Sequence, residues 1–432
     1  MDAIADIRLV DGPLFWTAWA AGAAGVIYLL WPRGKRWPLV PVLATVLAAV
    51  IVAAVHWLLI YVFSTFPEEL PREVLGWFVP AVAGILLWTT RLVPAGWKAR
   101  CAATAAMLGV LLLSSVQVNA YFGLSRTVGD LLGTAVARIP PLEEKLTRQA
   151  GSAAPVPLAD WARPEGLPSE GVLRKAEIPG TSSGFDAREA YIYLPPAYQS
   201  PERPALPVLV LFSGQPGGPA DWLTGGALRS HMDRFAARHN GVAPVVVVVD
   251  PNGSPSGNSL CMDSRIAKAD TYLSVDVPGW ISATLDVDAE RRNWGVGGFS
   301  FGGTCAMQLG TRHPELYGSI LAFASEQEPA LAKEREKTVE ASFGGDTNAF
   351  EAQTPLHLMR HHRFESSAVY FAAGAADPEF TGYMDVLSAA ARGAGFHVEV
   401  RHIADSGHSW ETVSKGMPDA LDFLASRWGI RP

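Results

Sequence analysis

The chain has 432 residues, 49% of them hydrophobic, and its 35 lysines and arginines against 42 aspartates and glutamates leave a net charge of -7. This length is too great for one ordinary domain, so at least two are expected. The acidic balance, with no long basic run in the second half, argues against nucleic acid as a partner.

Four apolar stretches predict a transmembrane domain over residues 1–122. They are almost free of charge and cover residues 12–31, 38–63, 74–90 and 101–122. Each approaches or exceeds the roughly 20 residues that a helix needs to cross the hydrocarbon core. The third is the shortest, and the alternative of a re-entrant or interfacial segment is disfavoured by the charges around it. A cleaved signal peptide explains the first stretch poorly, because mainly acidic residues precede it and three more apolar stretches follow.

The short loops between these stretches predict the orientation of the chain. The first loop carries Arg33, Lys35 and Arg36, the third carries Arg91, Lys98 and Arg100, and the middle one carries Glu68, Glu69 and Glu73 against Arg72. Basic loops favour the cytoplasmic side of a membrane. With four crossings, the N-terminus and everything after residue 122 are therefore expected outside the cytoplasm, in a multi-pass protein of the plasma membrane.

Residues 123–170 form an expected juxtamembrane segment and linker. Residues 127–138 could make an amphipathic helix at the membrane surface, and packing on their own domain is the alternative. Residues 151–170 are rich in alanine and proline, which suits a linker.

From residue 171 to the C-terminus, apolar runs of strand length alternate with longer helix-like segments. The expected strands are 190–194, 206–212, 244–249, 294–299, 319–324, 368–372 and 398–403. The first alternates as a half-exposed strand would, whereas the second and third are continuous and apolar, as strands buried on both faces are. This succession predicts an α/β domain with a mainly parallel sheet over residues 171–432.

The stretch GGFSFGG, residues 297–303, places one serine between glycine pairs where a strand passes into a helix. Glycines fit beside a sharp strand-to-helix bend, and such a bend exposes the hydroxyl of the central serine, Ser300. A glycine-rich turn that merely contains a serine is the alternative. The motif alone is a weak signal, so its value depends on the residues that follow later strands.

Asp377 and His408 follow the strands expected at 368–372 and 398–403. The chain order Ser300, Asp377, His408 is that of α/β-hydrolases, whose ligands gather at the carboxyl ends of the strands. His408 would be the general base and then the acid for the serine, and Asp377 would orient and stabilise the imidazole. Glu379 and Asp405 are alternatives for the acid, disfavoured because Glu379 lies further past its strand and Asp405 belongs to the loop of the histidine.

The negative oxygen of a tetrahedral intermediate needs hydrogen-bond donors. The first candidate is the backbone NH of Phe301, the residue after the nucleophile. The second is expected in the loop 213–218, SGQPGG, where the NH of Gln215 follows a flexible glycine and precedes a proline. This chemistry requires neither a cofactor nor a metal.

The remaining histidines and cysteines have less specific interpretations. His397 and His402 are interpreted as structural, and a solvated helix end explains His357, His361 and His362 better than a metal site, because no H-E-x-x-H pattern is present. Helix packing is preferred to function for His56 in the second apolar stretch. Cys101 lies in a membrane stretch, while Cys261 and Cys305 could form a disulfide or remain two separate thiols.

The C-terminal region resembles the "putative esterase" family of α/β-hydrolases, which includes esterase D, feruloyl esterases and actinobacterial mycolyltransferases. The resemblance covers residues 171–432 and rests on 191–198, 214–218 with Asp221 and Trp222, the bend at Ser300, and 407–410 with Trp410. It implies acyl transfer from an ester through a serine acyl-enzyme, with Asp221, Trp222 and Trp410 near the substrate. Multi-span actinobacterial relatives share this architecture. Mycolyltransferases use a glutamate and are secreted, which argues against their trehalose and mycolate specificity here.

Together these features predict a membrane-anchored, extracytoplasmic serine esterase or acyltransferase that acts on a lipid or cell-envelope ester. The bilayer and that ester are the expected partners, whereas the sequence does not indicate an oligomeric state. The alternative is an inactive hydrolase-fold module that binds or assembles partners on a membrane scaffold. Transport through the four helices is disfavoured because they carry almost no charged residues.

Overall fold

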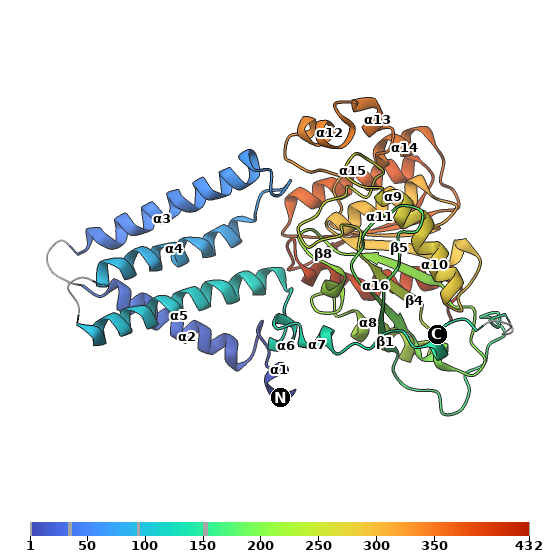
Figure 1. Cartoon of the computed structure of the whole chain (residues 1–432), viewed down its shortest axis with the longest axis horizontal. Coiled ribbons are helices and arrows are strands. Elements are labelled where there is room, and N and C mark those ends of the chain that lie inside the picture. The colour runs from blue at the N-terminus through green and yellow to red at the C-terminus, as the bar shows by residue number, and fades with distance from the viewer. Residues whose placement is uncertain (1, 33–36, 93–95, 150–153, 432) are drawn as a thin grey trace. The chain divides into compact units, whose positions relative to one another are not determined.

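The computed structural model describes residues 2–32, 37–92, 96–149 and 154–431 (Figure 1). Internal contacts divide the chain into two compact units. The helical unit comprises Met1–Ala135 with Leu331–Arg335, and the sheet unit comprises Val136–Ala330 with Glu336–Pro432. The division after Ala135 lies within residues 123–170, the segment expected to connect the two domains.

Four long helices build the helical unit, after the short helix α1 (Asp2–Ala5). They are α2 (Pro13–Leu30), α3 (Leu39–Trp57) with a π-helical continuation (Leu58–Val62), α4 (Arg72–Leu92) and α5 (Trp97–Phe122). All four are long and apolar enough to cross a membrane, including α4, whose apolar stretch is the shortest in the sequence. The expected set of candidate spans is therefore confirmed. The basic residues Arg33, Lys35 and Arg36 lie outside the described residues.

Small residues let two of these helices approach closely. A Cβ atom added to Gly25 of α2 would lie 2.3 Å from the carbonyl oxygen of Ala106 in α5. A Cβ on Gly109 of α5 would lie 2.7 Å from the carbonyl oxygen of Ala21 in α2. Glycine at such positions is typical of membrane helices, where packing rather than the hydrophobic effect holds neighbours together. His56, also within this unit, accepts a hydrogen bond at Nε2 from the NH of Leu70, 3.2 Å away.

The segment after α5 differs from the expectation. Instead of one helix over residues 127–138, there are two single-turn helices, α6 (Val128–Leu131) and α7 (Thr134–Ala137). Gly133 separates them with a φ of 65°, which ends a right-handed helix. The side chain of Thr127 caps α6 and accepts a hydrogen bond from the NH of Asp130.

The expected linker is only partly a linker. Residues 151–153 lie outside the described part of the chain. Beyond them, Val156 forms a bridge with Pro204, and Nε1 of Trp161 donates to the carbonyl of Glu202, 3.0 Å away. The described remainder of this segment is thus bound to the sheet unit.

An eight-stranded sheet forms the centre of the sheet unit, in the order β1-β2-β4-β3-β5-β6-β7-β8. Strand β1 pairs antiparallel with β2, and β2 pairs antiparallel with β4. The strands β4, β3, β5, β6, β7 and β8 are parallel neighbours. The strands are β1 (Val172–Ala176), β2 (Ala190–Leu194), β3 (Val208–Phe212), β4 (Val245–Val249), β5 (Trp294–Phe299), β6 (Ser319–Phe323), β7 (Ala368–Gly374) and β8 (His397–Ile403). The predicted α/β class with a mainly parallel sheet is confirmed.

The antiparallel edge of the sheet contains the two departures from the expected strands. Strand β1 was not predicted, because its sequence VLRKA contains two charged residues and is only partly buried. It pairs with β2, so β2 is not the edge of the sheet. All five residues of β2 are buried, and the half-exposed strand expected there is wrong. The hydroxyl of Tyr193 in β2 is also bound, to Asp233 Oδ1 at 2.7 Å.

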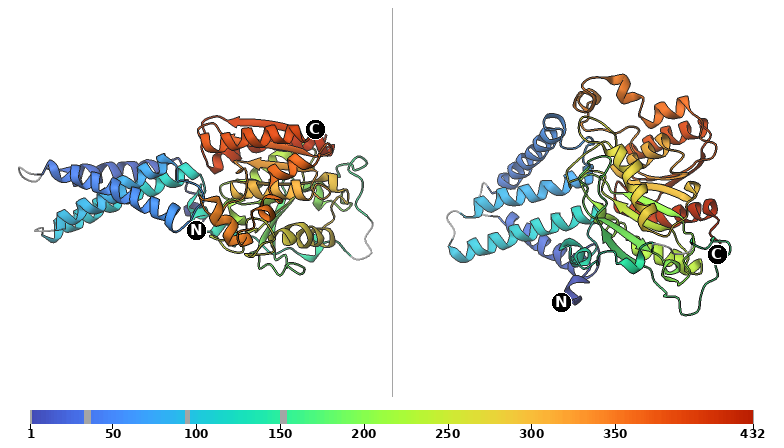
Figure 2. Two further views of the ribbon diagram at one scale, coloured as in Figure 1. Left: turned by 90° about the horizontal axis from the view of Figure 1, so that it is seen from above. Right: turned by 45° about the vertical axis from the view of Figure 1, so that its right-hand side comes forward.

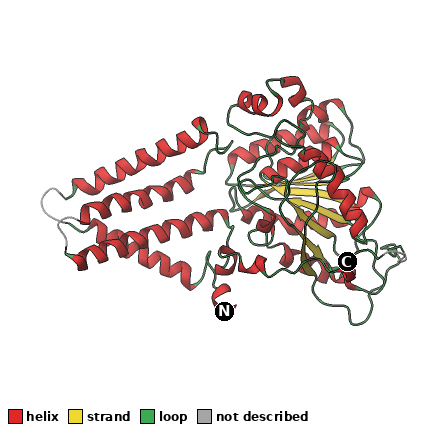
Figure 3. Ribbon diagram, in the orientation of Figure 1, coloured by secondary structure: helices red, strands yellow, loops and turns green. Residues whose placement is uncertain are grey.

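Helices cover both faces of the sheet (Figures 2 and 3). One group contains α8 (Leu228–Arg238) and α16 (Trp410–Trp428), which contact each other, and a second contains α11 (Phe301–Arg312), α14 (Pro355–His361) and α15 (Pro378–Gly393). The other helices are α9 (Ala269–Thr271), α10 (Val277–Thr284), α12 (Arg335–Phe343) and α13 (Thr347–Glu351). The central strands are apolar on both faces because both faces are covered, and their side chains form the core.

Candidate active site

Ser300 stands at the bend between β5 and α11. Its backbone φ of 56° and ψ of -122° lie in a region that side chains rarely adopt, so the residue is strained. A Cβ on Gly298 would lie 2.2 Å from the carbonyl carbon of Gly302, and one on Gly302 would lie 2.2 Å from the carbonyl oxygen of Phe212. The glycines around the serine are therefore required by close backbone contacts, as the motif predicts.

Three residues from different strand ends meet at this bend. Nε2 of His408 lies 2.9 Å from Oγ of Ser300, and Nδ1 of His408 lies 3.1 Å from Oδ2 of Asp377. Asp377 also begins α15, where its Oδ1 accepts a hydrogen bond from the NH of Phe380, 3.3 Å away. This second bond fixes the carboxylate, which in turn fixes the imidazole.

The surroundings hold the imidazole of His408 in place. Its ring lies 4.0 Å from the ring of Phe380 and 5.1 Å from that of Phe299, measured between centroids. The loop before it approaches the end of β7, because a Cβ on Gly374 would lie only 2.3 Å from the carbonyl oxygen of Ser406. Gly374 thus allows the loops of Asp377 and His408 to meet, a role that the sequence pattern did not indicate.

The other candidates for the acid are placed differently. Glu379 accepts a hydrogen bond from the hydroxyl of Tyr383 at 2.7 Å, and Asp405 is exposed. His397 and His402 are exposed on the edge strand β8, where His397 stacks on Phe423. Among the three candidates for the acid, all of which lie in the described part of the chain, Asp377 is the one that forms a hydrogen bond with His408.

The histidine pair of α14 has an ordinary helical arrangement. His357 and His361 stack with centroids 4.2 Å apart, and Nδ1 of His361 lies 2.8 Å from the carbonyl of His357. In the described ranges no group of three or more His, Cys, Asp and Glu side chains could hold a metal ion.

The two expected oxyanion donors belong to the two segments next to the serine, the start of α11 and the loop after β3. The NH of Phe301 is at the first turn of α11, where helix geometry leaves NH groups without partners. Gln215 lies in the loop after β3. A Cβ added to its neighbour Gly214 would lie 3.4 Å from the Cβ of Ser300. Within the described part of the chain, neither NH donates to a backbone acceptor outside a regular element. Both donors remain available to a ligand.

The aromatic residues expected near the substrate lie beneath the site. Trp222 has no exposed surface, and its Nε1 donates to the carbonyl of Phe212 at 2.9 Å. Its ring meets the edge of the nearly buried Trp410, which in turn lies 5.0 Å from Phe299. The expectation that Trp222 contacts substrate is therefore wrong for this arrangement, since burial against the strand end leaves it no free surface.

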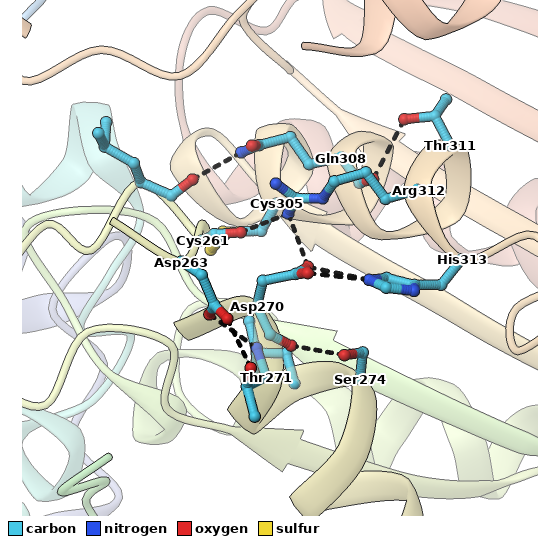
Figure 4. A network of polar contacts seen from close by, with 12 residues as sticks. Cys261, Asp263, Asp270, Thr271, Ser274, Cys305, Gln308, Thr311, Arg312 and His313 are labelled. Atoms are coloured by element: carbon cyan, nitrogen blue, oxygen red, sulfur yellow. Dashed lines mark hydrogen bonds and ion pairs between the residues drawn. A yellow bond between two sulfur atoms is a disulfide. The ribbon is translucent and has the colours of Figure 1, made fainter. Parts of the chain in front are cut away.

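A polar network attaches α11 to the segment before it (Figure 4). Cys261 and Cys305 form a disulfide, which decides between the alternatives left open by the sequence. Further along the same helix, Gln308 donates to the carbonyl of Leu260 at 2.8 Å. Asp270 binds Arg312 and His313, each at 3.0 Å. The helix that follows Ser300 is thus held by one covalent and several polar contacts (Figure 4).

The region that contains these residues also matches known proteins. Residues 185–424, more than half of the chain, match the family described as "Putative esterase". An uncharacterised protein of Corynebacterium glutamicum is 39% identical over 271 residues, which cover 60% of this chain and 63% of that protein. The match thus spans less than two thirds of the length of this relative.

Solved structures share the fold of the sheet unit. A ferulic acid esterase has a TM-score of 0.52 and 18% identity, over 60% of this chain and 99% of that one. An S-formylglutathione hydrolase from Agrobacterium tumefaciens has a TM-score of 0.49 and 22% identity, over 61% and 97%. At these identities the likeness concerns the fold.

Proposed function

Since the chain belongs to this esterase family of serine hydrolases, we propose that it is a membrane-anchored enzyme that cleaves or transfers the acyl group of a lipid or cell-envelope ester outside the cytoplasm. The observation that carries the proposal is the chain of hydrogen bonds from Ser300 through His408 to Asp377, at 2.9 and 3.1 Å. The strained backbone of Ser300 adds to it, because strain of this kind clusters at functional sites.

The proposed reaction begins when Ser300 Oγ attacks the carbonyl carbon of the ester. Nε2 of His408 takes the hydroxyl proton, and Asp377 stabilises the positive imidazolium that results. The carbonyl oxygen becomes negative and accepts hydrogen bonds from the NH groups of Phe301 and Gln215. The C–O bond to the alcohol then breaks, and His408 returns the proton to the departing oxygen, leaving an acyl group on Ser300.

The second half repeats these steps with a new nucleophile. His408 takes a proton from water or from an acceptor hydroxyl, whose oxygen attacks the acyl-enzyme. The bond to Ser300 breaks, and the serine regains its proton from His408. Water gives a carboxylic acid, and an alcohol gives a new ester, so the acceptor alone separates hydrolysis from transfer.

Two observations support a location outside the cytoplasm. The described basic residues Arg91, Lys98 and Arg100 lie at one pair of helix ends, whereas Glu68 and Glu69 lie in the connection before α4 and Glu73 lies in the first turn of α4. In addition, the disulfide between Cys261 and Cys305 belongs to a kind of bond that persists mainly in oxidising compartments. A membrane anchor raises the concentration of the enzyme near amphiphilic esters, which favours a lipid substrate.

The test uses the full-length protein purified in detergent. A fluorophosphonate probe is expected to label the wild type and not a Ser300→Ala variant of equal thermal stability. Incubation with total membrane lipid is then expected to change the mass spectrum of at least one lipid ester in the wild type only. A folded wild-type protein that resists labelling would contradict the proposal and favour an inactive binding module.

A further inference from the structure

The loop of residues 213–218 connects β3 to the short helix Pro219–Trp222 and passes beside Ser300. A Cβ on Gly214 would lie 3.4 Å from both the Cβ of Ser300 and the carbonyl oxygen of Phe299. Because Gln215 belongs to this loop, whatever holds the loop also sets the direction of its backbone NH.

Asp221 binds the loop through its carboxylate. Oδ2 accepts a hydrogen bond from the NH of Gly218, 2.8 Å away. The same oxygen lies against Gly217, where an added Cβ would be only 2.3 Å from it. At the start of the loop, Oγ of Ser213 donates to the carbonyl of Gly218 at 2.5 Å. Residues 213–218 are therefore closed into a turn that depends on the position of this carboxylate.

A buried ion pair stands beside this turn. Asp250 has no exposed surface and accepts two hydrogen bonds from the guanidinium of Arg188, from Nε at 2.8 Å and from Nη2 at 2.7 Å, and a third from the backbone NH of Arg188 at 3.0 Å. Nη1 of Arg188 lies close to the loop, since a Cβ on Gly218 would be 2.7 Å from it. Burial raises the pKa of Asp221 to about 6, while the NH of Gly218 and the charge of Arg188 act in the opposite direction. The turn therefore lies next to the carboxylate of Asp221 on one side and next to Arg188, which Asp250 holds in place, at Gly218.

We propose that Asp221 is a positioning residue, which holds residues 214–218 so that the NH of Gln215 faces the oxygen that becomes negative when Ser300 attacks. The inference rests on the proposed function and deepens it. It also replaces the expectation that Asp221 binds substrate, because Oδ2 of the carboxylate is bonded to the loop. A substrate ligand affects KM, whereas a group that aligns a transition-state donor affects kcat.

The experiment compares the full chain with three variants on a soluble p-nitrophenyl ester. Asp221→Ala removes the acceptor. Gly217→Ala adds a Cβ 2.3 Å from Oδ2 of Asp221 and 2.9 Å from the carbonyl oxygen of Gly214, so it displaces the carboxylate and the loop from each other. Both are expected to lower kcat about 10- to 100-fold with KM within about two-fold, because small misplacement of an aligned group is costly. Asp221→Asn keeps an oxygen that can accept from Gly218, so it is expected to recover most of the kcat.

Two matched controls separate alignment from general damage. Asp286→Ala removes a buried, ion-paired carboxylate that precedes β5, and Gly279→Ala adds a methyl group that meets nothing within 4 Å. Both are expected to keep the wild-type kcat. An increase in KM alone for Asp221→Ala would show substrate contact and overturn the inference, as would an unchanged kcat in both Asp221→Ala and Gly217→Ala.

The outcomes remain distinct from a failure of the proposed function itself. In that case the wild type would neither hydrolyse the ester nor react with the fluorophosphonate at Ser300. If Asp221→Ala does not fold, Gly217→Ala decides by the same kcat and KM criteria.

Discussion

Oγ of Ser300 lies 2.9 Å from Nε2 of His408, although 108 positions of sequence separate the two residues. The two loops meet because β5 and β8 end at the same edge of one parallel arrangement, with β6 and β7 between them. Catalysis as proposed depends on this pair and on the carboxylate that orients it, which gives the first prediction.

Replacement of Asp377 by asparagine is expected to lower kcat about 10³- to 10⁴-fold, because the amide favours the wrong tautomer of His408 and stabilises the imidazolium poorly. Steady-state kinetics with a p-nitrophenyl ester would measure this change. Glu379→Gln is the matched control, since Glu379 bonds to Tyr383 and is expected to leave kcat within about two-fold. Equal losses in the two variants would argue against Asp377 as the acid.

Substitution of Gly302 by alanine is expected to destabilise the sheet unit by about 3 kcal/mol, the upper range for overpacking. The added methyl group would lie 2.2 Å from the carbonyl oxygen of Phe212, and this backbone atom has no room to move. Thermal denaturation of the purified protein checks the shift. Gly279→Ala, which adds the same group in open space, is expected to leave the midpoint nearly unchanged.

Loss of the disulfide by Cys305→Ala is expected to reduce stability by about 2–4 kcal/mol, because the bond closes a loop between residues 44 positions apart. The change would appear as a lower midpoint in non-reducing buffer. Dithiothreitol is expected to lower the wild-type midpoint in the same way and to have little further effect on the variant. Cys101→Ala serves as the control, since Cys101 lies in α5 and forms no disulfide.

Asp221→Asn is expected to be more stable than the wild type at neutral pH, and this difference in stability is expected to shrink at acid pH. The pKa of Asp221 is raised by burial from its ordinary value of 3.8 to about 6, so above pH 6 the folded state contains a buried charge at a cost. As pH falls from about 6 to 4, the folded state binds a proton before the unfolded state does, and the cost disappears.

The stability gained by Asp221→Asn is therefore largest above pH 6, at most about 3 kcal/mol, and declines toward pH 4. Unfolding midpoints of wild type and variant at pH 7.5 and pH 4.5 would measure this difference. A gain that does not vary with pH would show that Asp221 is not the titrating group.

The proposed orientation predicts the behaviour of reporter fusions. Alkaline phosphatase fused after residue 123 is expected to be active, because this enzyme folds only where its disulfides form. Fusion after Trp97, at the start of α5, is expected to give an inactive reporter. The opposite pattern would place the sheet unit in the cytoplasm.

Several features were readable from short stretches of sequence. The four candidate membrane spans follow from the length of uncharged apolar runs, and the bend at Ser300 follows from the glycines on both sides of it. Asp377 and His408 could be chosen because polar residues directly after buried strands meet at one edge of a parallel sheet. Each of these signals depends on neighbouring residues or on the order of elements along the chain, so no distance had to be known.

Other features depended on contacts between distant segments. The partially charged β1 was missed because its strand conformation is stabilised by pairing with β2. The burial of β2, which was expected to be half-exposed, likewise depends on segments that lie elsewhere in the sequence. The hydrogen bond between Asp377 and His408 is visible only in the structure, and the disulfide needed the approach of Cys261 to α11.

The sequence by itself determined the four long apolar helices, the α/β class and the residues at the strand ends, because hydrophobic length, strand order and glycine content can be read along the chain. Only the tertiary structure decided which side chains touch. It placed Trp222 under the site instead of within it, and it gave Asp221 the loop as its partner. Such pairings follow from the packing of strands and loops that lie far apart along the chain, and no local pattern encodes the distances between them.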